Sequence, residues 1–248
     1  MRDHPEINVN WTNPDHSQWS GLHAASFYGH AEAVKLLLAH ANIEVNLKDW
    51  RRQTPFSFGC VIGHVSVVEV QLQDPRVDIT LDDKDGCSPL WHAALCGGYQ
   101  VIEWLISSGR NLGDIKNKKG KNWRDDKNYT ALEIARKNES EVGSLLERYL
   151  TNPALTHHEL RVKLGVLDEV AAEVFALTVF LCDDLLRLRP ACNLAATSRF
   201  FIIASKMPLE LQRILCHRAV GSMKQNILHK DSEAAFKSPA WVLRSQPQ

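Results

Sequence analysis

The sequence predicts an all-α protein: a solenoid of stacked helix pairs with β-hairpin tips, followed by an α-helical C-terminal cap domain. One motif recurs four times, and each copy opens on an aspartate: Asp15, Asp49, Asp83 and Asp125. The intervals are 34, 34 and 42 residues, and self-similarity at such a period is typical of stacked repeats. The register is lost after about residue 151, so a different helical region follows the repeats.

The four copies read DHSQWSGLHAASFYGH, DWRRQTPFSFGCVIGH, DDKDGCSPLWHAALCGG and DDKNYTALEIARKNES, and three of them continue into apolar runs. This pattern resembles the ankyrin repeat family, whose unit of about 33 residues has a T-P-L-H-x-A signature, a β-turn and two antiparallel helices. The resemblance implies a repeat domain over residues 1–151, in which a partial repeat precedes four copies at about 15–48, 49–82, 83–124 and 125–151.

Helix boundaries within the copies follow from residue type. Pro55 and Pro89 open the first helix, where the fixed φ of proline is favourable and its missing N–H is not needed. A glycine in the left-handed conformation is expected to end that short helix in three copies, at Gly29, Gly63 and Gly97. The second helix then supplies apolar residues at helical spacing, such as Val34, Leu37 and Leu38.

Some residues depart from the repeat pattern. Gln71 stands where other copies have Leu37 and Leu105, so we expect a buried amide, which costs roughly 1–3 kcal/mol without a partner. Trp91 replaces the signature histidine and Gly59 a usual alanine, which predicts a stack less stable than an idealised one. Residues 6–10 resemble the end of a repeat, so we expect either that upstream repeats or a partner cover the first face, or that this edge is partly disordered.

The C-terminal region, residues 152–248, is predicted to be helical. Asn152-Pro153 breaks the chain, and Thr156 with Glu159 forms a capping-box pattern that should start a helix running to Pro190. The apolar stretch 170–182 is too short to span a membrane and indicates a buried core helix. Further helices are expected over 194–206 and after Pro208, with a frayed tail over 238–248.

One short segment of this region has a second interpretation. Residues 207–215, MPLELQRIL, resemble the opening helix of an F-box, the motif that docks adaptors onto cullin-type ubiquitin ligases. An ordinary helix that begins with Pro208 in its first turn would have the same sequence pattern. Both interpretations stay open at this point.

Composition narrows the functional class. The chain has 44% hydrophobic residues and zero formal net charge, so no net field attracts it to nucleic acid or to an acidic membrane. The first residues lack the apolar core of a signal peptide, so we expect an intracellular, cytoplasmic protein, with a nuclear location as the alternative. The six cysteines form no C-x-x-C pair and are expected to be reduced.

Patterns for chemistry are incomplete. His157-His158-Glu159 lacks the second histidine of a zinc-protease helix, and residues 82–86 have the wrong acidic spacing for a calcium loop, which indicates a solvated hairpin tip. The resemblance implies that His23, His30 and His64 hydrogen-bond the loops of neighbouring repeats. We therefore expect no catalytic residue, no cofactor, no metal and no small-molecule substrate.

The family resemblance implies a protein-binding surface made of hairpin tips and the concave side of the first helices. In this chain the predicted partner-binding residues are Trp19, Phe27, Tyr28, Trp50, Arg51, Gln53, Lys84, Asp85, Leu95 and Tyr129. Five of them are aromatic or arginine residues from two adjacent repeats, the types that dominate interface energetics. The insertion before the fourth copy is either a solvated loop or a second contact, through Lys118, Lys119, Lys121 and Trp123.

Three functional hypotheses follow. The first is a non-catalytic protein-interaction module with an unidentified protein partner, and neither nucleic acid nor membrane is expected as the partner. The second is a substrate adaptor of a cullin-type ubiquitin ligase that uses the F-box-like helix. The third is an enzyme whose site lies in the helical half, which a pocket of polar groups with perturbed pKa values would indicate.

Overall fold

The structure is a computed structural model, and it describes residues 8–15, 17–138, 141–182, 204 and 209–220. The chain divides into two compact units, Met1–Leu160 and Arg161–Gln248. Each unit is described by itself. The division at residue 151 expected from the repeat register stays a prediction.

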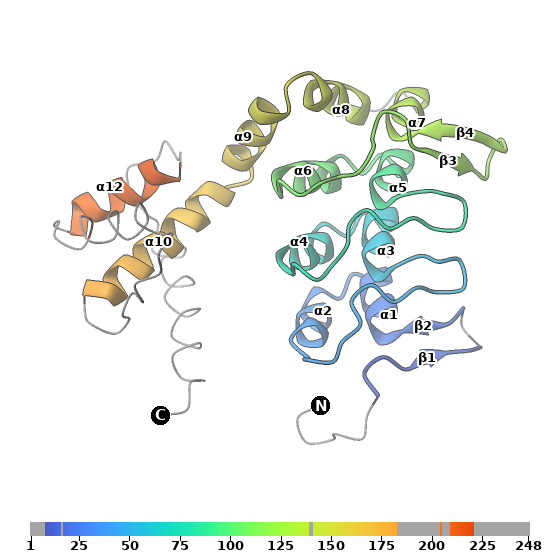
Figure 1. Cartoon of the computed structure of the whole chain (residues 1–248), viewed down its shortest axis with the longest axis horizontal. Coiled ribbons are helices and arrows are strands. Elements are labelled where there is room, and N and C mark those ends of the chain that lie inside the picture. The colour runs from blue at the N-terminus through green and yellow to red at the C-terminus, as the bar shows by residue number, and fades with distance from the viewer. Residues whose placement is uncertain (1–7, 16, 139–140, 183–203, 205–208, 221–248) are drawn as a thin grey trace, which may run out of the picture. The chain divides into compact units, whose positions relative to one another are not determined.

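Within its described residues the first unit contains four helix pairs. They are α1 (Gly21–Phe27) with α2 (Ala31–Leu38), α3 (Pro55–Ile62) with α4 (Val65–Gln73), α5 (Pro89–Cys96) with α6 (Tyr99–Ser107), and α7 (Ala131–Lys137) with α8 (Glu141–Thr151). Helices α1, α3, α5 and α7 form one column, and the hairpins project from the side away from α2, α4 and α6 (Figure 1). The predicted all-α solenoid with hairpin tips is therefore confirmed.

The first helix of each pair begins at a capped position. In all four pairs a serine or threonine side chain accepts the backbone N–H three residues later, the caps being Ser20, Thr54, Ser88 and Thr130. Pro55 and Pro89 occupy the first turn, as predicted. The predicted left-handed glycines are also confirmed, because Gly29, Gly63 and Gly97 have φ values of 76°, 85° and 71°.

The core runs the length of the stack between the two columns of helices. Buried apolar side chains from the first helices meet those of the second helices, and Leu22, Phe56, Val34, Val68 and Ile102 are among those with almost no exposed surface. The amide of Gln71 is fully buried in this core, as predicted. Its Nε2 donates to the hydroxyl of Ser26 at 3.2 Å, whereas its Oε1 has no partner.

The hairpins show where the extra residues of the fourth copy lie. Strand β3 (Lys119–Asn122) pairs with β4 (Lys127–Thr130), and Gly120 lies opposite Tyr129. In the third copy the backbone N–H of Asp83 bonds to the carbonyl of Cys87, four residues on. Five of the eight extra residues therefore lengthen the hairpin itself, and three precede it, where the sequence interpretation placed the whole insertion.

This register corrects two of the four aspartate markers. The N–H of Lys84 donates to the carbonyl of Arg51, and the N–H of Lys121 donates to that of Asp85, so Lys121 repeats the position of Lys84. Gly120, and not Asp125, therefore takes the place of Asp83, and a Cβ there would lie 2.6 Å from the sulfur of Cys87. In the first hairpin, β1 (Thr12–Asn13) and β2 (Trp19–Ser20) pair so that Asn13, not Asp15, opens the turn.

Side chains also join one repeat to the next. Arg76 donates to the carbonyl of Leu38 at 2.6 Å, and Arg110, 34 residues later, donates to the carbonyl of Val77 and to that of Asp74 at 3.4 Å. Arg76 thus satisfies a carbonyl group at the end of α2, where no intrahelical partner exists, and Arg110 binds one carbonyl at the end of α4 and one in the loop that follows it.

Two asparagines make a second kind of link between repeats. Asn10 bonds the backbone of Asn42 and Glu44, just as Asn46 bonds the backbone of Arg76 and Asp78. Asn10 therefore does belong to a repeat end, as its sequence pattern predicts.

The helix after the repeats starts earlier than predicted. Helix α9 (Pro153–Lys163) begins at Pro153, and Asn152 Oδ1 accepts the N–H of Leu155 at 3.2 Å. Thr156 is buried inside the helix, so the predicted capping box is wrong, because the asparagine-proline pair already supplies the cap. Gly165, with φ 75°, then separates α9 from α10 (Val166–Cys182) and interrupts the single long helix that was predicted.

In the second unit α10 packs against α12 (Leu209–Ala219) through Ala172, Phe175, Ala176 and Cys216. The predicted helix over 194–206, the end of the long helix at Pro190 and the tail over 238–248 lie outside the described residues, apart from Ala204, which is helical. Residues 1–7 lie outside them too. None of the described helices combines the length and the apolar character needed to cross a membrane.

Candidate functional site

An aromatic cluster lies on the first two repeats, formed by Trp19, Phe27, Tyr28 and Phe58. The ring of Trp19 is 5.0 Å from Phe27 and 4.8 Å from Phe58, and Tyr28 is 5.2 Å from Phe27. The rings meet edge to face or tilted, the arrangements that aromatic pairs prefer. Tyr28 is 63% exposed, so the cluster reaches the surface of the stack.

Local structure holds this cluster in place. Ser20 caps α1 directly after Trp19, and α1 ends with Phe27 and Tyr28 before the left-handed Gly29. The ring of His64 covers Gly29 so closely that a Cβ would lie 2.8 Å from it, and His64 Nε2 lies 2.9 Å from the carbonyl oxygen of Phe27. The second repeat therefore fixes the last turn of α1, which carries the two rings.

Phe58 was missed by the sequence interpretation. It lies on α3 at the position that the first copy fills with Ala24 and the third with His92. The interpretation took only the last two residues of each first helix as concave, and this position lies one turn earlier. The available signal was an aromatic residue at a place where another copy has alanine.

Trp50 forms a second exposed feature, at the tip of the second hairpin. Its ring is 51% exposed and lies beneath two cations, with Arg51 Cζ 5.5 Å and Lys84 Nζ 5.3 Å from its centroid. The buried carboxylate of Asp49 builds the tip, because its Oδ1 accepts the N–H groups of Arg51 at 2.9 Å and Gln53 at 2.7 Å. The indole is thus presented on an ordered turn.

The other predicted contact residues are placed less favourably. Asp85 lies 3.7 Å from the guanidinium of Arg51, so with Lys84 it borders Trp50. The carbonyl of Gln53 already binds Asp49 and His23, and Leu95 is buried. Tyr129 is half-buried; its hydroxyl donates to Asp125 at 2.7 Å and Lys137 lies 4.7 Å above its ring.

The long fourth hairpin is less basic than its sequence indicates. Lys118 pairs with Asp82, and Lys121 Nζ lies 2.6 Å from Asp126, while Lys119 is exposed. Trp123 is 73% exposed with Arg124 5.2 Å from its ring. Two of the three lysines therefore have an acidic neighbour, and the tip presents one tryptophan rather than a free patch of cations.

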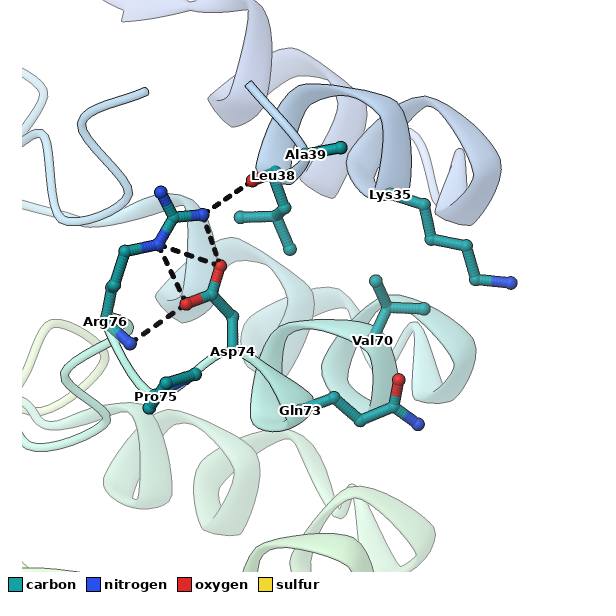
Figure 2. A pocket seen from close by; sticks show the side chains of 8 residues that line it. All are labelled: Lys35, Leu38, Ala39, Val70, Gln73, Asp74, Pro75 and Arg76. Carbon is teal, nitrogen blue, oxygen red and sulfur yellow. Dashed lines mark hydrogen bonds and ion pairs between the residues drawn. The ribbon is translucent and has the colours of Figure 1, made fainter. Parts of the chain in front are cut away.

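A groove of about 410 Å³ lies on the other column of helices, between the ends of α2 and α4. Figure 2 shows Arg76 at one side of it, fixed between the carboxylate of Asp74 and the carbonyl of Leu38, with Val70 and Lys35 at the other. The Arg76 guanidinium lowers the pKa of Asp74, so the pair is matched in charge. The polar atoms of Arg76 and Asp74 already bond to each other and to the carbonyl at the end of α2. This groove is therefore a weaker candidate for a binding site than the aromatic surface.

Comparison with known proteins agrees with the repeat register. Residues 17–50 and 85–118 match the sequence model of the ankyrin repeat. Ankyrin repeat domain-containing protein 63 of Homo sapiens is 37% identical over 111 residues, which is 42% of this chain and 26% of that protein. Alpha-latrotoxin-Lg1a of Latrodectus geometricus is 34% identical over 95 residues, covering 38% of this chain and 7% of the toxin.

A third relative is the probable E3 ubiquitin-protein ligase XBOS32 of Oryza sativa, 42% identical over 89 residues, or 36% of this chain and 18% of that protein. The chain thus spans about a quarter or less of each of these relatives. The stacked helix pairs and the sequence matches lead to the same assignment. Residues 17–50 and 85–118 of this chain therefore resemble ankyrin repeats both in sequence and in fold.

Proposed function

We propose that this chain is a non-catalytic protein-interaction module that binds its partner through the first two repeats. The binding surface consists of the aromatic cluster (Trp19, Phe27, Tyr28 and Phe58) and the hairpin tip of Trp50 and Arg51. The observation that carries the proposal is the half-exposed Trp50, which lies under two cations on a turn built by Asp49. Ankyrin repeats are generally protein-interaction modules, and this surface has the residue types that dominate protein interfaces.

The order of the surface supports the proposal. Association costs free energy when side chains must be fixed, and rings already packed on one another lose little freedom. Trp19 contacts both Phe27 and Phe58, and the backbone of Trp50 donates to the carbonyl of Ser17 at 3.2 Å, so the cluster and the tip are joined through the first hairpin. Such a surface suits a partner that inserts an apolar or aromatic side chain.

The charges around Trp50 indicate which residues of the partner would lie beside its apolar or aromatic anchor. Arg51, Arg52 and Lys84 are exposed there, together with the exposed carboxylate of Asp85. The edge of the surface therefore favours a partner with acidic residues beside its apolar anchor, through steering and complementary contacts.

The adaptor hypothesis gains no specific observation. Leu209–Ala219 is helical, which both the F-box-like interpretation and a plain helix start predict, and Pro208 lies outside the described residues. The rice relative is named a ubiquitin-protein ligase, but its match covers 18% of that protein. We therefore do not propose the adaptor role.

Quantitative affinity purification tests the proposal. The full chain, the Trp50→Ala variant and the Trp123→Ala variant are each used as bait, and captured proteins are compared by mass spectrometry. Trp123 is the matched control, an exposed tryptophan stacked with an arginine on another hairpin. A protein retained by wild type and by Trp123→Ala but lost with Trp50→Ala supports the proposed surface. Tyr28→Ala and the double variant Trp50→Ala/Tyr28→Ala serve as further baits. A partner that is captured equally by wild type, Trp50→Ala, Tyr28→Ala and the double variant refutes the proposed surface.

A further inference from the structure

Three potential metal ligands meet at the third repeat: Asp83, Cys87 and His92. His92 Nε2 lies 2.8 Å from Asp83 Oδ2, and one ligand atom from each residue, including Cys87 Sγ, lies within 4.8 Å of the others. Asp83 and Cys87 are buried and His92 is partly buried. Sequence reasoning treated residues 82–86 as a solvated tip, because the histidine and the cysteine lie outside that stretch.

The hairpin and helix α5 bring the three residues together. Asp83 opens the turn, and its Oδ1 accepts the N–H groups of Asp85 and Cys87, both at 2.9 Å. Its second oxygen is left to face His92 on the first turn of α5. The turn does not depend on Oδ2, so a ligand can take that oxygen without unfolding the hairpin.

The other repeats lack this set of donors. The positions that match Asp83, Cys87 and His92 hold Asp49, Gln53 and Phe58 in the second copy. The aspartate is thus part of the shared turn, whereas sulfur and imidazole are particular to the third repeat. The cluster is not a by-product of the repeat pattern.

The surroundings of the sulfur are negative. Cys87 Sγ lies 3.5 Å from the carbonyl oxygen of Lys121 and 3.8 Å from that of Asp85, and Gly120 of the next hairpin covers it. The carboxylates of Asp83, Asp85 and Asp82 also lie near the thiol. Asp82 also has a buried oxygen, Oδ1, without a partner. Acceptors surround the thiol, and a cation is the group that they would stabilise.

We propose that Asp83 Oδ2, Cys87 Sγ and His92 Nε2 form a Zn²⁺ site that joins the third hairpin to α5. Zinc accepts oxygen, sulfur and nitrogen ligands together, and three protein ligands with one water complete its tetrahedral shell. A carboxylate and a thiolate carry two negative charges, so the site is neutral with Zn²⁺. Hard cations such as Ca²⁺ and Mg²⁺ are excluded by the sulfur and the imidazole.

Binding requires a small rearrangement and the loss of one proton. Around a tetrahedral zinc with N and O ligands near 2 Å, the two donor atoms lie about 3.3 Å apart, so the present 2.8 Å contact between His92 and Asp83 must open slightly. The Cys87 thiol gives its proton to solvent and becomes a thiolate. The imidazole exchanges its Nε2 proton for one on Nδ1 and binds zinc as a neutral ligand.

The site has a consequence for the surface described above. Lys84 and Asp85, which border Trp50, lie between the ligands Asp83 and Cys87. A metal at both ends of that turn holds it in one conformation. The zinc site itself does not rest on the proposed partner surface, so either can fail without the other.

Cobalt substitution tests the site directly. The purified full chain is stripped with EDTA, dialysed and titrated with Co²⁺, which shows a thiolate-to-metal absorption band when cysteine binds it. We expect one equivalent to produce the band, excess Zn²⁺ to abolish it, and Zn²⁺ to raise the thermal midpoint of the stripped protein. The absorption band and the rise in the thermal midpoint should vanish in Cys87→Ser and in His92→Gln. Both should persist in Cys96→Ser, which removes an exposed thiol from α5, the helix that carries His92.

The outcomes separate cleanly. A missing band at stoichiometric Co²⁺, or a band that survives in Cys87→Ser, overturns the proposal. Circular dichroism checks that each variant is folded. If Cys87→Ser does not fold, His92→Gln decides, because His92 is partly exposed and removing it leaves the turn bonds of Asp83 intact. A band unchanged in His92→Gln then refutes the three-residue site.

Discussion

The indole of Trp91 takes over a bond that histidine makes in another repeat. Trp91 Nε1 donates to the carbonyl of Tyr129 at 2.8 Å, while His23 Nε2 lies 3.2 Å from the carbonyl of Gln53. The two acceptors hold the same place in their hairpins, because Gln53 pairs with Asp49 and Tyr129 pairs with Gly120. Each bond therefore joins a first helix to the next hairpin. Trp91, which replaces the signature histidine, therefore still links its helix to the next hairpin.

Replacing this donor should destabilise the stack. Trp91→Phe keeps most of the apolar volume but leaves the Tyr129 carbonyl without its indole partner, so we expect a loss of about 1–2 kcal/mol in the free energy of unfolding. Urea titration measures it. Trp123→Phe, at a position 73% exposed, is the control and should change stability little. Equal effects of both substitutions would mean that the bond contributes nothing.

Gln71 and Ser26 form a second testable pair. Gln71→Leu removes the unpartnered Oε1 and adds an apolar side chain, but it also takes the partner of the Ser26 hydroxyl. The double variant Gln71→Leu/Ser26→Ala removes both polar groups, and we expect it to be about 1 kcal/mol more stable than wild type. The stability of Gln71→Leu alone should lie between that of wild type and that of the double variant.

Thermal and urea unfolding of all four proteins close this double-mutant cycle. Ser26→Ala alone strands the Gln71 amide and should be the least stable of the set. Should the double variant melt below wild type, the cavity or strain it introduces outweighs the buried amide, and the interpretation of Gln71 as a liability fails.

His23 makes the stack sensitive to acid. Burial lowers the pKa of this imidazole below 6.5, and its Nδ1 accepts the N–H of Ser20 at 3.1 Å, which needs the neutral form. The folded pKa lies below the unfolded one, so its contribution to stability is fully present above pH 6.5. It is lost as the pH falls from 6.5 towards the folded pKa, at up to about 1.4 kcal/mol per pH unit.

The test compares unfolding curves between pH 8 and pH 5. His23→Gln should be less stable than wild type at pH 8 and should lose less stability on acidification, because the proton taken up on unfolding is gone. His158→Gln, at an exposed position of α9, controls for the new amide. Parallel pH profiles for wild type and His23→Gln would exclude His23 as the source of acid sensitivity.

The sequence predicts the helix pairs well because their signals are local. A capping hydroxyl, Pro55 or Pro89 after it, and a glycine at the end each act within one turn, and all appear in the structure. Register across an insertion is not local. Asp125 matches the motif, yet Gly120 opens the turn, since the pairing depends on the space beside Cys87. Thr156 likewise matches a helix-cap pattern, but α9 already begins at Pro153 and is capped by Asn152.

Relations between repeats were the least predictable. Arg76 and Arg110 are 34 residues apart, and that spacing could have revealed them, but their roles depend on which carbonyls face them. Phe58 joins the aromatic cluster because α3 packs beside Trp19, which no pattern within one copy can show. The contact between Asp83 and His92 is likewise not visible in the repeat pattern, because it depends on how the hairpin folds against α5.

The final prediction compares Trp50 with the lysines of the fourth hairpin as candidate contacts for the partner. Trp50→Ala should weaken partner binding by roughly 2 kcal/mol or more, as truncation of a central aromatic anchor does, while the fold is retained because Asp49 still builds the turn. Calorimetric titration with a partner found by affinity purification measures it. The loop variant Lys118→Ala/Lys119→Ala/Lys121→Ala should change affinity little, since two of these lysines already face Asp82 and Asp126. A large loss for the loop variant with unchanged affinity for Trp50→Ala would move the binding site to the fourth hairpin, where Trp123 is then the anchor to remove.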